Sequence, residues 1–137
     1  MSEQHDTVRQ IRQWVEKAEH DLAASEHLLR LSGQELADVV CYHCQQCAEK
    51  YLKVLLSWHR VHFPKTHDLR LLLDLVPPNV SLGLQRTEVI PLNRYMIEGR
   101  YPGEWEPITE DEAESALDMA RGVRRAVRAC LPEESLK

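Results

Sequence analysis

The sequence predicts an all-α protein, in which about four longer helices form an antiparallel bundle and one short helix crosses it. Apolar residues recur at helical intervals over long stretches, and the alternation typical of strands is hard to find. Only five glycines interrupt the 137 residues, which suits long uninterrupted helices. A chain of this length can build one hydrophobic core, so we expect a single helical domain over residues 1–137.

The first helix is expected from about Thr7 to Leu31. Thr7 and Gln10 have the spacing of a capping box, and Ser32-Gly33 supplies a stop signal. Its inward face should consist of apolar and small residues spaced three or four positions apart, namely Val8, Ile11, Val15, Ala18, Leu22, Ser25 and Leu29.

A second long helix is expected from Gln34 to about Phe63, because glycine and proline are absent before Pro64. At 100° per residue, one of its faces is apolar and has Cys47 at its margin: Ala37, Val40, Cys41, Cys44, Ala48, Tyr51, Leu52 and Leu55. The opposite face, which we call the polar stripe, consists of Tyr42, His43, Gln46, Glu49, Lys50 and Lys53. Periodicity alone favours a solvated helix face for this stripe.

A short third helix is expected from Leu69 to Val76, where Thr66 can act as its cap and Pro77-Pro78 ends it. The fourth segment, Leu84 to about Gly99, carries Pro91 in its middle. A proline inside a helix removes a hydrogen-bond donor and clashes with the preceding turn. We therefore expect this segment to be either kinked at Pro91 or helical only from Pro91 onward.

The last helix is expected to begin with a cap formed by Thr109 and Glu112. Acidic residues occupy its first turns, and its later turns carry Arg121, Arg124, Arg125 and Arg128. This order of charges complements the helix dipole and supports the helical assignment.

Three of the four cysteines lie at intervals of three in the stretch CYHCQQC, which begins at Cys41. Cys44-x2-Cys47 followed by His59-x2-His62 has the ligand order of a zinc site. On one continuous helix, Cys44 and His59 would lie roughly 22 Å apart, so zinc would require a break that the sequence does not signal. We therefore interpret the thiols, Cys130 included, as packing residues and predict no metal and no cofactor. A disulfide or redox role is the less favoured alternative.

Charge and hydropathy restrict the class of protein. The formal net charge of -5 argues against a generally basic nucleic-acid-binding surface but leaves room for a local basic groove. No apolar run approaches the ~18 residues that span a bilayer. The first residues, MSEQHDTVRQIRQW, carry charges where a signal peptide needs an apolar stretch. We expect a cytoplasmic protein with no membrane segment.

Four ordered blocks of the sequence together resemble the HEPN domain proteins of prokaryotes, which implies one HEPN-like domain. They are WVEKAEHDLAASEHLL (14–29), CYHCQQCAEKYLKVLL (41–56), THDLRLL (66–72) and LNRYMIEGRYP (92–102). In that family the second block typically has a histidine, two glutamines, small residues and then EK and LK. The matching residues here are His43, Gln45, Gln46, Glu49, Lys50, Leu52 and Lys53. The resemblance gives the polar stripe a functional interpretation beside the solvated one.

The resemblance also bears on catalysis, because many HEPN relatives are ribonucleases with an arginine followed a few residues later by a histidine. Arg100 lies where such an arginine is expected, but no histidine occurs after His67. Arg60 and His67 fit the spacing outside the usual place of the motif, so they are only weak catalytic candidates. Efficient ribonuclease activity is therefore not expected.

The resemblance implies a protein that binds nucleotides or RNA. Arg100 and Lys50 could hold phosphate, tyrosines could stack on a base, and His43 or Gln46 could read a base edge. The full set of expected binding residues is His43, Gln46, Lys50, His67, Asn93, Tyr95, Arg100 and Tyr101.

The resemblance further implies a homodimer that acts with a minimal nucleotidyltransferase in a two-component, toxin–antitoxin-like system. Trp58, Trp105 and Tyr101, near expected helix ends, could anchor a partner subunit. Two alternatives remain: a metal-independent HEPN ribonuclease and a non-catalytic protein-interaction module. A nucleotidyltransferase gene beside this one would favour the two-component interpretation.

Overall fold

A computed structural model of the protein describes residues 2–96 and 106–136. Within these residues all regular structure is helical, which confirms the predicted fold class. Three long helices form the body of the molecule: α1 (Ser2–Ser32), α2 (Ala37–Trp58) and α4 (Glu110–Ala129). The shorter elements are the α-helix α3 (Leu69–Leu75) and the 3-10 helices η1 (Arg86–Glu88), η2 (Ile90–Tyr95) and η4 (Glu133–Leu136).

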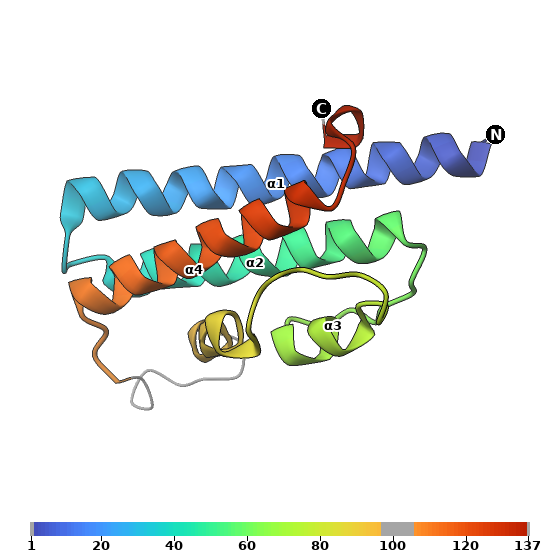
Figure 1. The fold of residues 1–137 in the computed structure, drawn as a ribbon. Helices are drawn as coiled ribbons and strands as arrows, with labels where there is room; N and C mark the ends of the chain where they lie inside the picture. The colour runs from blue at the N-terminus through green and yellow to red at the C-terminus, as the bar shows by residue number, and fades with distance from the viewer. Residues whose placement is uncertain (1, 97–105, 137) are drawn as a thin grey trace.

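Helix α2 is the central element of the fold. It packs against α1, α4, α3 and η2, and Figure 1 shows α1 above it, α4 crossing in front of it and α3 below it. Most of its residues are buried, including the predicted apolar face from Ala37 to Leu55. Because α2 is covered on several sides, it also buries polar residues, among them Gln45, Glu49 and Lys53.

Helix α1 presents its predicted face to the core. Ile11, Val15, Ala18, Leu22 and Ser25 are buried, whereas Val8 and Leu29 at the ends of the face are only partly buried. The helix begins at Ser2, ahead of the predicted cap at Thr7, because the chain from 2 to 6 contains no helix-breaking residue.

The turn between α1 and α2 favours a glycine. Gly33 has a φ of +55°, and a β-carbon there would approach Glu110 Oε1 to 2.7 Å. The side-chain amide of Gln34 forms two hydrogen bonds with the backbone at the start of α4. Its Nε2 donates to the Ile108 carbonyl at 2.7 Å, and its Oε1 accepts from the Glu110 amide at 2.6 Å. The turn therefore fixes the start of α4 beside the end of α1.

The prediction that α2 continues to Phe63 is wrong, because the helix ends at Trp58. Arg60 has a φ of +57° and occupies the left-handed position of a Schellman motif. The Val61 amide donates to the Leu56 carbonyl at 2.9 Å, and the Arg60 amide donates to the Ser57 carbonyl at 3.1 Å. Glycine usually fills this position, so an arginine gives the sequence no stop signal.

The segment after α2 differs in detail from its prediction. Helix α3 ends at Leu75, and its cap is Asp68, whose Oδ1 accepts from the Arg70 amide at 3.0 Å. Thr66 Oγ1 instead accepts from the Asp68 amide at 3.1 Å. The stretch around Pro91 forms 3-10 turns, with the proline at the start of η2, where its missing N–H does no harm. The end of the predicted fourth helix lies outside the described residues.

The cysteines are packing residues, as predicted. Cys41, Cys44 and Cys47 are buried as free thiols along α2. Burial raises the pKa of Cys41 to about 12 and that of Cys44 to about 11, and it also raises the pKa of Cys47. Cys130 is partly exposed, and its Sγ lies 3.6 Å from the Ser81 carbonyl oxygen. Within the described residues, no cluster of three or more histidine, cysteine or acidic side chains could hold a metal ion.

We expect thiol reagents to distinguish Cys130 from the other three cysteines, because the thiolate is the reactive form and burial keeps the α2 thiols neutral. In the native protein at about pH 8, Ellman's reagent should modify Cys130 quickly and the α2 thiols only after unfolding. Peptide mass spectrometry would identify the modified residue, and Cys130→Ser should remove the fast phase. Fast modification of Cys41, Cys44 or Cys47 in the folded protein would contradict this assignment.

Candidate functional site

One end of the polar stripe is organised by Asp21, which α1 presents to α2. Its side chain is only 11% exposed. Asp21 Oδ1 lies 2.8 Å from His43 Nδ1, and Oδ2 accepts from Lys50 Nζ at 2.5 Å. A carboxylate that binds Nδ1 fixes the orientation of the imidazole and leaves Nε2 for another partner. His43 and Lys50, two turns apart on α2, are therefore held toward the same carboxylate, and both remain partly exposed.

The other end of the stripe is organised by Glu49, whose side chain is 3% exposed. Glu49 Oε2 accepts from Lys53 Nζ at 2.9 Å, one turn along the same helix. Glu49 Oε1 lies 2.9 Å from His67 Nδ1 and accepts from the side-chain amides of Gln45 at 3.2 Å and Gln46 at 3.3 Å. A buried carboxylate needs this number of donors to compensate for the hydration it has lost.

Lys53 is buried together with its partner, at 7% side-chain exposure. Its Nζ lies 5.3 Å from the centre of the Trp14 ring and 5.8 Å from that of Phe63, within the range of cation–π attraction. The solvated interpretation of the polar stripe is therefore wrong for Glu49 and Lys53. The covering residues belong to α1 and to the loop after α2, which a helical wheel of α2 alone cannot include.

The structure brings together four of the eight predicted binding residues. His43 and Lys50 meet at Asp21, while Gln46 and His67 meet at Glu49. Gln46 also donates to Gln45 Oε1 at 2.7 Å. The stripe with His67 thus contains two polar clusters, one centred on Asp21 of α1 and the other on Glu49 of α2.

Asn93 and Tyr95 hold other parts of the fold together. Asn93 Oδ1 accepts from the Leu69 amide at 2.8 Å, and its Nδ2 donates to Asp68 Oδ1 at 2.9 Å, so the side chain joins η2 to the start of α3. The Tyr95 hydroxyl donates to Glu112 Oε2 at 2.6 Å and so joins η2 to α4. Burial, and then Glu112, raise the pKa of Tyr95.

The remaining candidates do not join the stripe in the part of the chain that is described. Arg100 and Tyr101 lie outside the described residues. Arg60 lines a cavity near the start of α1 whose lining does not include His67, and His67 Nδ1 is occupied by Glu49. The geometry therefore does not support the hypothesis that Arg60 and His67 form a catalytic pair.

Asp21 is the residue that sequence reasoning missed. Its position carried a signal, because it lies three residues after Ala18 and four before Ser25, both on the predicted inward face of α1. An acidic residue at such a position must find donors on the neighbouring helix, and His43 and Lys50 supply them.

Comparison with known proteins identifies the family of this helical arrangement. The HEPN domain profile matches residues 11–130, which include α2 and the whole polar stripe. The chain belongs to the HEPN domain family. The family resemblance of the four sequence blocks is therefore confirmed.

Two solved structures have the same fold as this HEPN domain. The crystal structure of TT1696 from Thermus thermophilus is 30% identical, covers 88% of this chain and 98% of its own, and superposes with a TM-score of 0.71. The crystal structure of ST0689, an archaeal HEPN homologue, is 23% identical, covers 87% of this chain and 95% of its own, and has a TM-score of 0.68. A comparison with curated proteins gives no match.

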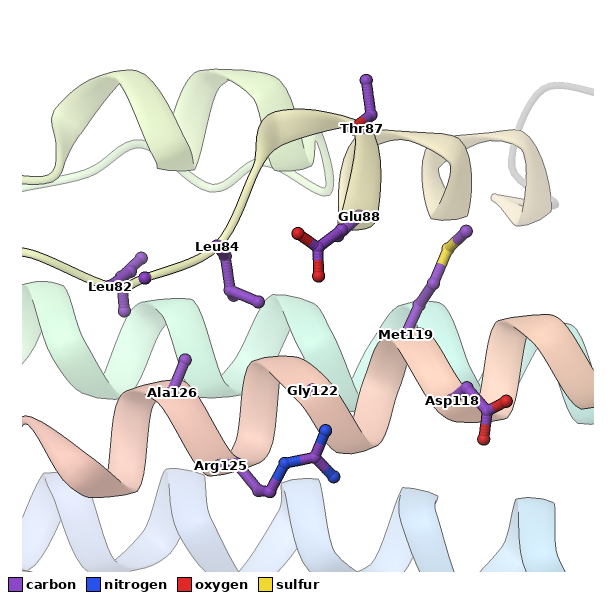
Figure 2. Close-up of a pocket in the computed structure, with 10 residues that line it drawn as sticks. Leu82, Leu84, Thr87, Glu88, Asp118, Met119, Gly122, Arg125 and Ala126 are labelled. Carbon is purple, nitrogen blue, oxygen red and sulfur yellow. The ribbon is translucent and has the colours of Figure 1, made fainter.

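This HEPN domain also has a cavity of about 500 Å³ between the segment 82–88 and α4. Figure 2 shows Leu84 and Glu88 directed toward α4 and Met119 directed back toward η1. The lining combines Arg125 with the carboxylates of Glu88 and Asp118 and includes none of the predicted binding residues.

Proposed function

We propose that this HEPN domain binds a nucleotide or a segment of RNA at the polar stripe and does not cleave RNA efficiently. One observation supports the location above all: four residues expected to bind are held by buried carboxylates. His43 and Lys50 contact Asp21, and Gln46 and His67 contact Glu49. Side chains held by buried partners lose less conformational entropy when a ligand arrives.

The hydrogen-bonding capacity of these residues suits a nucleotide. An ammonium group has three donors, and Lys50 uses one of them on Asp21, so it retains donors for a phosphate oxygen. His43 retains Nε2, and the Gln46 side chain, whose amide donates to Gln45 and Glu49, retains its carbonyl oxygen. A base edge can be read by such a combination of groups.

The charge of the stripe limits what it can do alone. The charges of Lys50 and Lys53 are balanced by Asp21 and Glu49 when both histidines are neutral. Net attraction for phosphate therefore needs a further cation, and we propose Arg100 of the RYP block for this role. The absence of any histidine after His67 in the sequence supports the proposal that the domain does not cleave RNA efficiently.

The proposal includes a homodimer and a minimal nucleotidyltransferase partner in a toxin–antitoxin-like system, which acts in the cytoplasm. Membership of the HEPN family supports this part. None of the described helices combines the length and apolar character that a bilayer crossing requires.

Titration of the full chain with AMP and with a short single-stranded RNA tests the stripe. We expect Lys50→Ala to weaken binding by about 5- to 30-fold at low salt, since a charge-assisted hydrogen bond to phosphate is lost. Asp21→Asn should strengthen binding, because the neutral amide no longer balances the charge of Lys50. Light scattering on the same samples would give the oligomeric state.

Lys17→Ala is the matched control, because Lys17 is exposed on α1 and should contribute only general charge. The stripe would be ruled out as the site if Lys50→Ala and Lys17→Ala had equal, small effects. RNA cleavage without metal that disappears in His67→Ala would instead show that the domain is a ribonuclease.

A further inference from the structure

A second cavity lies at one end of the bundle, where the first turns of α1 approach the turn that follows α2 (Figure 1). Its volume is about 780 Å³, and it is open to solvent, because Arg9, Arg60 and His62 of its lining are exposed. We call it the end cavity. It is lined by Thr7, Arg9, Gln10, Gln13, Ser57, Arg60, Val61, His62 and Phe63.

The end cavity differs from the rest of the molecule in charge. Arg9, Arg60 and His62 line it, and no carboxylate occurs among its described lining residues. The whole chain, in contrast, has 22 acidic and 17 basic residues. The cavity beside α4 contains Glu88 and Asp118, whereas the ionisable groups in the described lining of the end cavity are all basic. An anion is the ligand that such a lining attracts.

Arg60 lines the end cavity although its backbone conformation is unfavourable for arginine. Its φ of +57° is one that glycine adopts freely and that costs other residues roughly 1 kcal/mol. Within the described part of the chain, neither Arg60 nor His62 forms an ion pair or a side-chain hydrogen bond. The Arg60 guanidinium therefore contributes no contact that would explain its presence at a glycine position.

The remaining lining residues indicate which other chemical groups a ligand of the end cavity would carry besides its anionic group. Ser57 offers a hydroxyl group, and Phe63 offers a ring. The Phe63 ring is held from within the fold by Lys53, whose Nζ lies 5.8 Å from the ring centre. Hydroxyl and aromatic groups beside cations suit an organic molecule that carries a phosphate better than a bare ion.

We infer that the end cavity binds a phosphorylated small molecule, whose phosphate is held by Arg9 and Arg60 with His62 as a further donor. Guanidinium groups can hold phosphate oxygens through two parallel hydrogen bonds. This site is separate from the polar stripe and does not depend on the function proposed there. We favour a small molecule over RNA because the cavity is bounded by α1 on one side and the turn after α2 on the other.

The experiment is calorimetric titration of the full chain with inorganic pyrophosphate and, separately, with AMP. Arg60→Gly is the decisive variant, because it removes the guanidinium and gives the backbone the residue that its φ favours. We expect pyrophosphate to bind with 1:1 stoichiometry and Arg60→Gly to weaken it by about 10- to 100-fold, as expected for a lost charge-assisted contact. Its thermal stability should be unchanged or higher, and Arg9→Ala should also weaken binding.

Two controls separate this site from general charge. Arg125→Ala removes an arginine from the cavity beside α4 and should leave pyrophosphate binding unchanged, as should Lys17→Ala on the exposed side of α1. Equal weakening in Arg125→Ala and Arg60→Gly would overturn the inference. So would a protein that binds no pyrophosphate or AMP in the end cavity but loses affinity for a single-stranded RNA in Arg60→Gly, because the cavity would then be part of an RNA-binding surface.

Discussion

Replacing Glu49 with alanine is expected to lower the free energy of unfolding by about 3–5 kcal/mol, the largest effect we expect from a single polar substitution in this protein. The side chain is 3% exposed, and its loss leaves Lys53 at 7% exposure without a carboxylate. His67 and Gln45 lose the same acceptor. The cost arises mainly from the buried ammonium left without a partner, since burial of an unpaired charge is far more costly than burial of a pair.

Urea unfolding followed by circular dichroism would measure this change, with Glu16→Ala on the exposed side of α1 as the control. A double variant, Glu49→Leu with Lys53→Met, should be considerably more stable than Glu49→Ala, because it removes both charges and keeps the volume of the side chains. If Glu49→Ala changed stability no more than Glu16→Ala, the ion pair would not be buried in solution.

The burial of Glu49 and Lys53 could not be predicted from the sequence of α2 alone. Helical periodicity correctly predicted the inward face of α1 and the buried cysteines of α2, because those positions depend only on the spacing of residues within one helix. Lys53 instead packs against Trp14 from α1 and Phe63 from the loop after α2, and Glu49 contacts His67 from the same loop. A helical wheel contains no information about those neighbours.

The end of α2 illustrates a second limit. The sequence from Gln34 to Phe63 contains neither glycine nor proline, so local rules predict a continuous helix. Arg60 ends it by adopting a conformation that arginine rarely takes. Tertiary contacts can impose such a conformation, and positions of this kind are frequent at functional sites. The missed stop signal and the proposed end cavity therefore arise from the same residue.

Glu19 joins all three long helices and should make the fold sensitive to acid. From α1, its carboxylate accepts two hydrogen bonds from Arg124 on α4, at 2.8 and 3.0 Å. It also accepts from the buried Tyr51 hydroxyl on α2 at 2.5 Å, and Arg128 donates to the same hydroxyl at 3.2 Å. Burial raises the pKa of Glu19, but the hydrogen bonds from Arg124 and Tyr51 and the positive charges of Arg124 and Arg128 together outweigh it, so the pKa lies below the ordinary 4.5.

A carboxyl group whose pKa is lowered by folding stabilises the folded state above its unfolded pKa and loses that contribution as the pH falls through the folded value. At about pH 7, Glu19→Gln should lower the free energy of unfolding by about 0.5–1.5 kcal/mol, because charge-assisted hydrogen bonds become neutral ones while solvent screens a side chain that is 35% exposed. Below about pH 4 the difference from the wild type should shrink, since the protonated glutamate then resembles glutamine.

Urea unfolding of both proteins across this pH range tests the prediction, with Glu16→Gln as the control for net charge on α1. The difference between wild type and Glu19→Gln isolates one carboxylate, because all other titrating groups are common to both proteins. A difference that stayed constant from neutral to acid pH would mean that the ionised form of Glu19 does not hold α1, α2 and α4 together.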